Sequence, residues 1–126
     1  MSLTVAMDSG AIIALSRGDR TAIALLRYFR AHGAYFIVPA PVLTETLRGG
    51  KTDAAVYRIV NAMQIATLDK TAARDAGARL GATGSTSVID AMIVAVAVQA
   101  GATDILTSDP TDISKLTQQR LHVVQL

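Results

Sequence analysis

The stretch STSVIDAMIVAVAVQAGATDILTSDPTD, residues 85–112, decides the fold of this chain. Nearly every residue in 88–100 is apolar and Gly101 is a natural helix stop, so the segment predicts a short buried helix. Ser87 and Asp90 have the spacing of a capping box at its start. Alternating valines and alanines leave a strand as the alternative, although the alanines and the length favour a helix. The apolar run is far shorter than the ~20 residues that cross a bilayer.

A strand is predicted directly after this helix, at residues 104–107, and a turn then leads into a helix that begins at Pro110. If the strand lies beside the buried helix, Asp90 and Asp109 converge. An ionised carboxylate removed from water is costly unless it is paired, so Asp90 needs a positive or hydrogen-bonding partner. For Asp109 the alternative is helix capping, because Asp109, Pro110 and Asp112 make a complete helix start by themselves.

The rest of the chain alternates short apolar strands with amphipathic helices. Further strands are predicted at residues 3–7, 35–38, 63–67 and 122–124. Helices are predicted at 11–15, 19–30, 42–47, 53–63, 69–80 and 110–118, with a flexible loop at 81–86. Such alternation is typical of an α/β domain with a parallel sheet. We therefore expect one domain over residues 1–126.

Two more acidic residues have positions that suit a site at the edge of this sheet. Asp8 directly follows the first strand, and the carboxyl ends of parallel strands are where open α/β sheets bind ligands. Its alternative role is to cap the next helix. Glu45 is the only Glu in the chain, and its alternative role is a surface ion pair with Arg48. With Asp90 and Asp109, these residues are candidates for one shared acidic site.

The composition narrows the chemistry of such a site. The chain has no Cys, which excludes disulfides, thiolate zinc sites and Cys nucleophiles. The two histidines, His32 and His122, lie far in sequence from the acidic motifs, and ligation by oxygen alone favours Mg²⁺ or Mn²⁺ over zinc. A bound divalent cation lowers the pKa of a water and orients it toward a phosphodiester. The sequence therefore predicts metal-assisted phosphodiester hydrolysis.

The charge distribution suits a polyanionic substrate. If the four acids share one site, twelve Lys and Arg residues are left against six other acids. Arg20, Arg27 and Arg30 share one arc of the helix at 19–30, so they could contact phosphates, and Arg48 is a further candidate. The alternative is a solvated face. The aromatic fraction of 4% makes recognition by base stacking improbable.

The acidic motifs carry a resemblance to a known family. Asp8-Ser9-Gly10 after the first strand, Glu45 in VLTETL, Asp90 in VIDAMIVAVAVQAGA and Asp109 in ILTSDPTDI resemble, in order and spacing, the four acidic motifs of the PIN domain. The size and the TSDPTDI motif resemble the VapC-type ribonuclease toxins of toxin–antitoxin pairs. The resemblance covers essentially the whole chain. It implies a PIN-like three-layer α/β/α fold with a central parallel sheet and an endoribonuclease that depends on Mg²⁺ or Mn²⁺.

The resemblance also implies roles and partners. The implied catalytic carboxylates are Asp8, Glu45, Asp90 and Asp109. The implied metal ligands are Asp8, Asp90 and Asp109, and the supporting residues are Ser9, Thr107 and Asp112. Arg20, Arg27, Arg30 and Arg48 are then weak candidates for RNA binding. The implied partners are an RNA substrate, a cognate antitoxin that covers or occupies the acidic pocket, and a second copy in a homodimer. Gly10 replaces the larger residue of many members and is expected to loosen its turn.

Two other functions are weighed against the nuclease. A phospho-receiver signalling domain is also an α/β sheet of this length, but it needs an acidic pair after the first strand and a late strand-end Lys, whereas Lys115 falls inside a predicted helix. A PIN-like binding module without activity is the second alternative, which retention of all four acids disfavours. The first ten residues, MSLTVAMDSG, carry no basic signal-peptide region, so we expect a cytoplasmic protein with no membrane contact.

Overall fold

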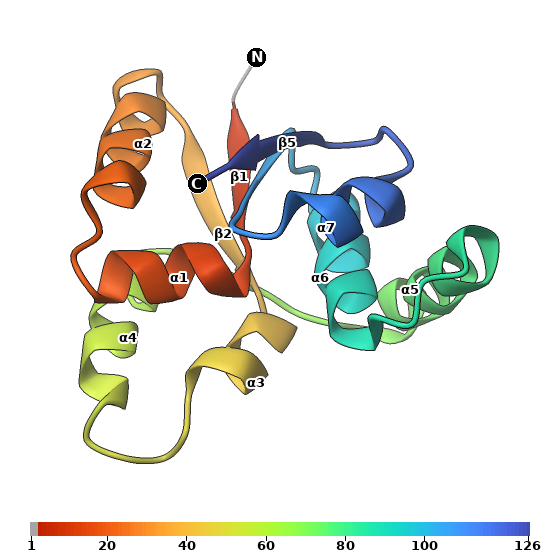
Figure 1. Cartoon of the computed structure of the whole chain (residues 1–126), viewed down its shortest axis with the longest axis horizontal. Coiled ribbons are helices and arrows are strands. Elements are labelled where there is room, and N and C mark those ends of the chain that lie inside the picture. The colour runs from red at the N-terminus through yellow and green to blue at the C-terminus, as the bar shows by residue number, and fades with distance from the viewer. Residues whose placement is uncertain (1–2) are drawn as a thin grey trace.

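Five parallel strands form one central sheet between two layers of helices (Figure 1). The computed structural model describes residues 3–126. The strands, in sheet order, are β3 (Gln64–Ala66), β2 (Tyr35–Pro39), β1 (Thr4–Met7), β4 (Asp104–Thr107) and β5 (His122–Gln125). The predictions of an α/β/α fold and a parallel central sheet are confirmed.

Seven helices connect the strands over the described residues. They are α1 (Ser9–Ser16), α2 (Arg20–Ala31), α3 (Pro41–Thr46), α4 (Asp53–Val60), α5 (Lys70–Thr83), α6 (Val88–Gln99) and α7 (Pro110–Thr117). Helices α1, α2 and α4 lie to one side of β1 and β2, while α5, α6 and α7 lie to the other (Figure 1). Among residues 3–126, no helix has the length and apolar character to cross a membrane.

The two central strands, β1 and β4, create a crevice at their carboxyl ends. They pair in parallel, with Ala6 opposite Ile105 and Met7 opposite Leu106. The chain leaves β1 into α1 on one face of the sheet and leaves β4 into α7 on the other (Figure 1). A reversal of this kind between neighbouring strands opens a crevice above their carboxyl ends, which is where open α/β sheets bind ligands.

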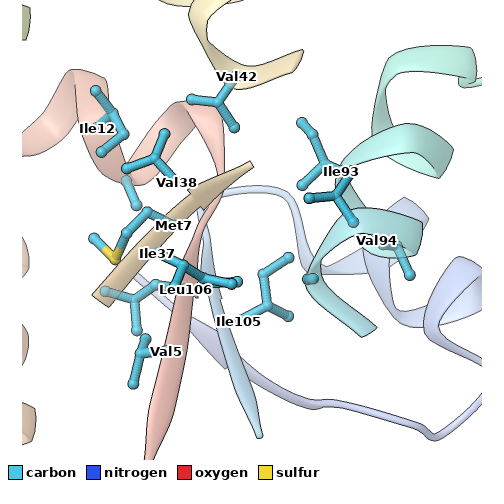
Figure 2. Close-up of a cluster of buried hydrophobic side chains, with 14 of the residues drawn as sticks. Val5, Met7, Ile12, Ile37, Val38, Val42, Ile93, Val94, Ile105 and Leu106 are labelled. Atoms are coloured by element: carbon cyan, nitrogen blue, oxygen red, sulfur yellow. The ribbon is translucent and has the colours of Figure 1, made fainter. Parts of the chain in front are cut away.

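The core is aliphatic and extends from the central strands to α6 (Figure 2). Val5, Met7, Ile105 and Leu106 are completely buried, because helices cover both faces of the parallel sheet. Helix α6 is buried along residues 93–97, as expected for a helix that is apolar nearly all round. The prediction of a helix rather than a strand for this segment is correct.

Two local predictions around α5 and α6 are wrong. Helix α5 runs to Thr83, so the expected loop at 81–86 begins only at Gly84, which ends the helix in the left-handed region at φ 72°. Ser87 precedes α6 but makes no side-chain capping bond; its hydroxyl donates instead to Asp112 Oδ2, 3.4 Å away. The side chain at the start of α6 is thereby turned toward α7.

Candidate functional site

Asp8 lies at the carboxyl end of β1, almost completely buried. Its Oδ1 accepts the Ser9 N–H at 2.7 Å, and its Oδ2 accepts the Thr107 hydroxyl at 2.6 Å. The first bond makes Asp8 the N-cap of α1 and the second ties it to β4. Asp8 therefore both caps α1 and belongs to the acidic site, although the sequence leaves these two roles as alternatives.

Thr107 and Asp109 lie at the carboxyl end of β4, next to Asp8 at the end of β1. The Thr107 side chain is completely buried, and its Oγ1 also accepts the Asp109 N–H at 3.0 Å. Asp109 occupies the N-cap position of α7, but its carboxylate makes no capping bond. The capping alternative for Asp109 is therefore wrong, and its carboxylate remains available to the neighbouring acids.

Glu45 reaches the same crevice from α3. Its Oε1 accepts a hydrogen bond from the Ser9 hydroxyl, which joins α3 to the start of α1. The alternative role of Glu45, an ion pair with Arg48, is absent, because Arg48 Nη1 donates to two backbone carbonyls, those of Thr44 at 2.9 Å and Leu47 at 2.8 Å. The carboxylate of Glu45 is left for the acidic cluster.

Five carboxylates gather at this point in two overlapping groups. In one group, oxygens of Asp8, Glu45 and Asp90 all lie within 4.8 Å of one another. In the other, the same holds for Asp90, Asp109 and Asp112. Asp90, at the first turn of α6, belongs to both. We call these five residues the acidic cluster.

The acidic cluster carries uncompensated negative charge. Burial raises the pKa of Asp8, more than offsetting its bonds from Thr107 and Ser9, and the charge of Glu45 adds to the rise. Burial also raises the pKa of Asp90 to about 6, assisted by repulsion from the other four acids. Over residues 3–126, the ion pairs are Arg79–Asp75 and His122–Asp104, and neither involves the acidic cluster.

The donor set of the acidic cluster fits a hard divalent cation. Its donors are all carboxylate oxygens, the ligands that Mg²⁺ and Mn²⁺ favour. Both histidines lie elsewhere: His32 Nδ1 is 2.8 Å from the Tyr28 carbonyl, and His122 Nδ1 is 3.0 Å from Asp104 Oδ2. A bound cation would also offset the burial and repulsion that raise the pKa values of Asp8 and Asp90.

Gly10 has a steric role that its place in the sequence does not indicate. A Cβ at this position would lie 1.9 Å from Ser108 Oγ and 2.9 Å from Ser108 Cβ. The start of α1 therefore packs closely against the turn after β4. The absence of a side chain at Gly10 permits this close approach. Ser108 carries no signal in the sequence that would have revealed this contact.

The candidate RNA-binding arginines separate in space. Arg48 borders a hollow of about 520 Å³ that opens beside Glu45, and Arg17, which sequence analysis missed, lies in the same lining. We call it the arginine hollow; its other borders include Ile13 and Val56. The arginines of α2 lie outside this lining, exposed on their helix. These are Arg20, Arg27 and Arg30, of which Arg30 lies 5.8 Å above the Phe36 ring.

Solved structures with the same fold come from toxin–antitoxin complexes. A chain of VapBC2 from Rickettsia felis, bound to a promoter DNA fragment, has a TM-score of 0.79 at 12% identity, with 98% of this chain and 99% of that chain covered. A toxin–antitoxin complex from Klebsiella pneumoniae has a TM-score of 0.76 at 19% identity, with 96% of each chain covered. DNA-bound VapBC from Salmonella typhimurium has a TM-score of 0.75 at 16% identity, with 98% of each chain covered. These likenesses establish the fold alone.

The family assignment comes from the sequence itself. No curated protein matches the chain. A family model for the PIN domain matches residues 5–117, a span that begins in β1, ends with α7 and includes every member of the acidic cluster. This chain belongs to the PIN domain family.

Proposed function

We propose that this chain is a divalent-metal-dependent endoribonuclease and the toxin of a VapBC-type pair. The observation that carries the proposal is the convergence of five carboxylates from four separate parts of the chain on the crevice between β1 and β4. PIN-domain membership and the likeness to toxin–antitoxin structures support it. The same family membership removes the support for a phospho-receiver domain.

The roles follow from the positions of the side chains. Asp8 from the first group, Asp109 from the second and Asp90 from both would hold Mg²⁺ or Mn²⁺, which when bound activates water and steadies charge on a phosphodiester. Thr107 orients Asp8 by its hydroxyl, and Ser9 orients Glu45 in the same way. The carboxylate of Glu45, held in place at the edge of the acidic cluster, is positioned to accept a proton from attacking water.

The proposal also covers a supporting role for Asp112 and the molecules that the chain binds. Asp112 accepts the Ser87 hydroxyl and lies in the second group of carboxylates, so it supports the cation from the outer side of the site. The proposed partners are an RNA substrate, an antitoxin that covers the acidic cluster, and a second copy of the chain. We propose a cytoplasmic location and a single domain over the full chain.

The test is metal-dependent cleavage of RNA. Purified protein is incubated with pooled cellular RNA and Mn²⁺ or Mg²⁺, with EDTA as the control. Asp8→Asn and Asp90→Asn each remove a ligand charge with little change in volume, so both variants are expected to lose cleavage and stay folded. Asp69→Asn is the matched control, because Asp69 caps α5 away from the site. Metal-dependent turnover in both Asp8→Asn and Asp90→Asn would refute the assignment, and a wild type that cuts no RNA would favour the inactive binding module.

A further inference from the structure

The arginine hollow lies beside the acidic cluster and is built by α1, α4 and the end of α3. It has a volume of about 520 Å³ and includes Glu45, so it opens directly onto the first group of carboxylates. Arg17 follows α1 and Arg48 follows α3, and both are exposed. Over residues 3–126, neither arginine forms an ion pair with an acid. Two cations are thus held next to, but not inside, a site that we propose cuts phosphodiesters.

Arg48 is held in place before any substrate arrives. Its Nη1 donates to the carbonyls of Thr44 and Leu47 at the end of α3, which fixes the guanidinium at the border of the arginine hollow. Its Nε and Nη2 groups make no bond to residues 3–126 and stay available as donors. A guanidinium with free N–H groups is well suited to phosphate oxygens, and prior positioning lowers the entropy lost on binding.

Further hollows continue past the acidic cluster on the other side. A hollow of about 300 Å³ shares Glu45 with the arginine hollow and also includes Ser87 and Asp90. A third, of about 220 Å³, shares Ser87 with the second and reaches Lys115 on α7. Shared residues therefore link the three hollows into one path across the acidic cluster. The path has two arginines at one end, Lys115 beside Asp112 at the other, and Glu45 and Asp90 between them.

We infer that a single strand of RNA lies along this path, with phosphates on one side of the scissile bond held by Arg17 and Arg48, and the other side of the strand passing Lys115. The inference rests on the proposed ribonuclease function. Charge favours a nucleic acid over an apolar protein segment, because the arginine hollow holds two exposed guanidinium groups and Lys115 adds a cation beside Asp112 at the other end. The linings of the three hollows contain no Phe or Tyr, so the strand is held by its backbone rather than by stacked bases.

The direct test is RNA binding as a function of salt. A fluorescein-labelled single-stranded RNA of mixed sequence is titrated with protein in an Asp90→Asn background that leaves the strand intact, and Kd is read by anisotropy. For single strands, each lost phosphate contact lowers the log–log salt slope by about 0.7, and at about 0.1 M salt that is roughly fivefold in Kd. Arg17→Gln/Arg48→Gln is thus expected to weaken binding roughly 25-fold and to lower the slope by about 1.4.

A charge-matched control separates the effect of phosphate contacts along the path from the effect of net charge on RNA binding. Arg74→Gln/Arg120→Gln removes two exposed cations outside the linings of the three hollows and is expected to leave Kd and slope nearly unchanged. Lys115→Gln is expected to weaken binding roughly fivefold, for one phosphate contact. Equal losses in the arginine pair and in the control would mean that only net charge matters, which would overturn the inference. Unchanged binding by the arginine pair would mean that no phosphate is held in the arginine hollow and would also overturn the inference.

A small substrate separates this inference from the proposed function. In the otherwise wild-type chain, Arg17→Gln/Arg48→Gln is expected to raise KM for RNA, whereas the control Arg74→Gln/Arg120→Gln keeps it. Mn²⁺-dependent hydrolysis of bis(p-nitrophenyl) phosphate by the wild type reports on the acidic cluster alone, because that diester reaches the cluster without filling the arginine hollow. A wild type that hydrolyses neither substrate contradicts the proposed ribonuclease. A wild type that cleaves RNA while the arginine variant keeps its KM contradicts only the strand path.

Discussion

Replacement of Asp90 by Asn should stabilise the metal-free protein at neutral pH, against the usual direction of a substitution in a buried site. Asp90 is the member shared by both groups of the acidic cluster, and burial with repulsion from four acids raises its pKa from 3.8 to about 6. Asn keeps the shape and removes the charge. The same change should remove most of the stabilisation that a divalent cation gives.

The magnitude follows from that pKa. A rise from 3.8 to about 6 corresponds to about 3 kcal/mol of unfavourable charging in the folded state. Because Asp90 is only half-buried, solvent screening reduces this to about 1–2 kcal/mol, or roughly 4–8 °C in Tm. The folded state binds the proton more tightly than the unfolded state, so this group lowers stability as pH rises from 3.8 through about 6. The advantage of Asp90→Asn should therefore be full above about pH 7 and fall to about a third at pH 4.5.

Urea unfolding at neutral and acidic pH, with EDTA or with Mn²⁺, measures both effects. At a Mn²⁺ concentration about 100 times Kd the wild type should gain about 2.7 kcal/mol, and Asp90→Asn should gain much less. Asp69→Asn is the control of opposite sign, because hydrogen bonds from the Ala72 N–H and the Gln99 side chain lower the pKa of Asp69, so its charge favours folding at neutral pH. If Asp90→Asn is less stable than the wild type in EDTA at neutral pH, or gains as much from Mn²⁺, the argument from crowded carboxylates is refuted.

Three further predictions concern two residues beside the acidic cluster and one buried arginine elsewhere. Gly10→Ala should cost about 1–3 kcal/mol because its Cβ meets the Ser108 side chain, and Ser108→Gly should recover most of that loss in a double-mutant cycle by thermal unfolding. Thr107→Val removes the hydroxyl that donates to Asp8, so it should cost about 1–3 kcal/mol and weaken Mn²⁺ binding measured by calorimetry, with Thr107→Ser restoring both. Arg79→Met removes the ion pair with the part-exposed Asp75 and two buried bonds to carbonyls in the last turn of α7, so urea unfolding should show a loss of about 1–3 kcal/mol; an unchanged stability would contradict the buried role of the arginine.

Most elements of the fold could be predicted from local patterns. Apolar strands, the helices that begin near residues 19 and 69, and the buried helix at 88–100 all lie close to where sequence analysis expects them. These features depend on residues close together in the chain, which is why sequence analysis can predict them. The differences arise where a side chain has several possible partners: Ser87 donates to the distant Asp112 instead of capping α6, and Arg48 donates to the nearby carbonyls of Thr44 and Leu47 instead of pairing with Glu45.

By itself, the sequence determined which side chains are chemically able to form a site: four acids in a known order, no thiol, and histidines remote from them. Only the tertiary structure decided that Asp90 is shared by two groups of carboxylates, that Asp112 joins them and that Arg17 lies beside them. The physical reason is that a carboxylate pKa and a ligand geometry depend on distances of a few ångströms between residues far apart in the chain. Those distances exist only once β1 and β4 lie side by side and the helices that follow them part to opposite faces.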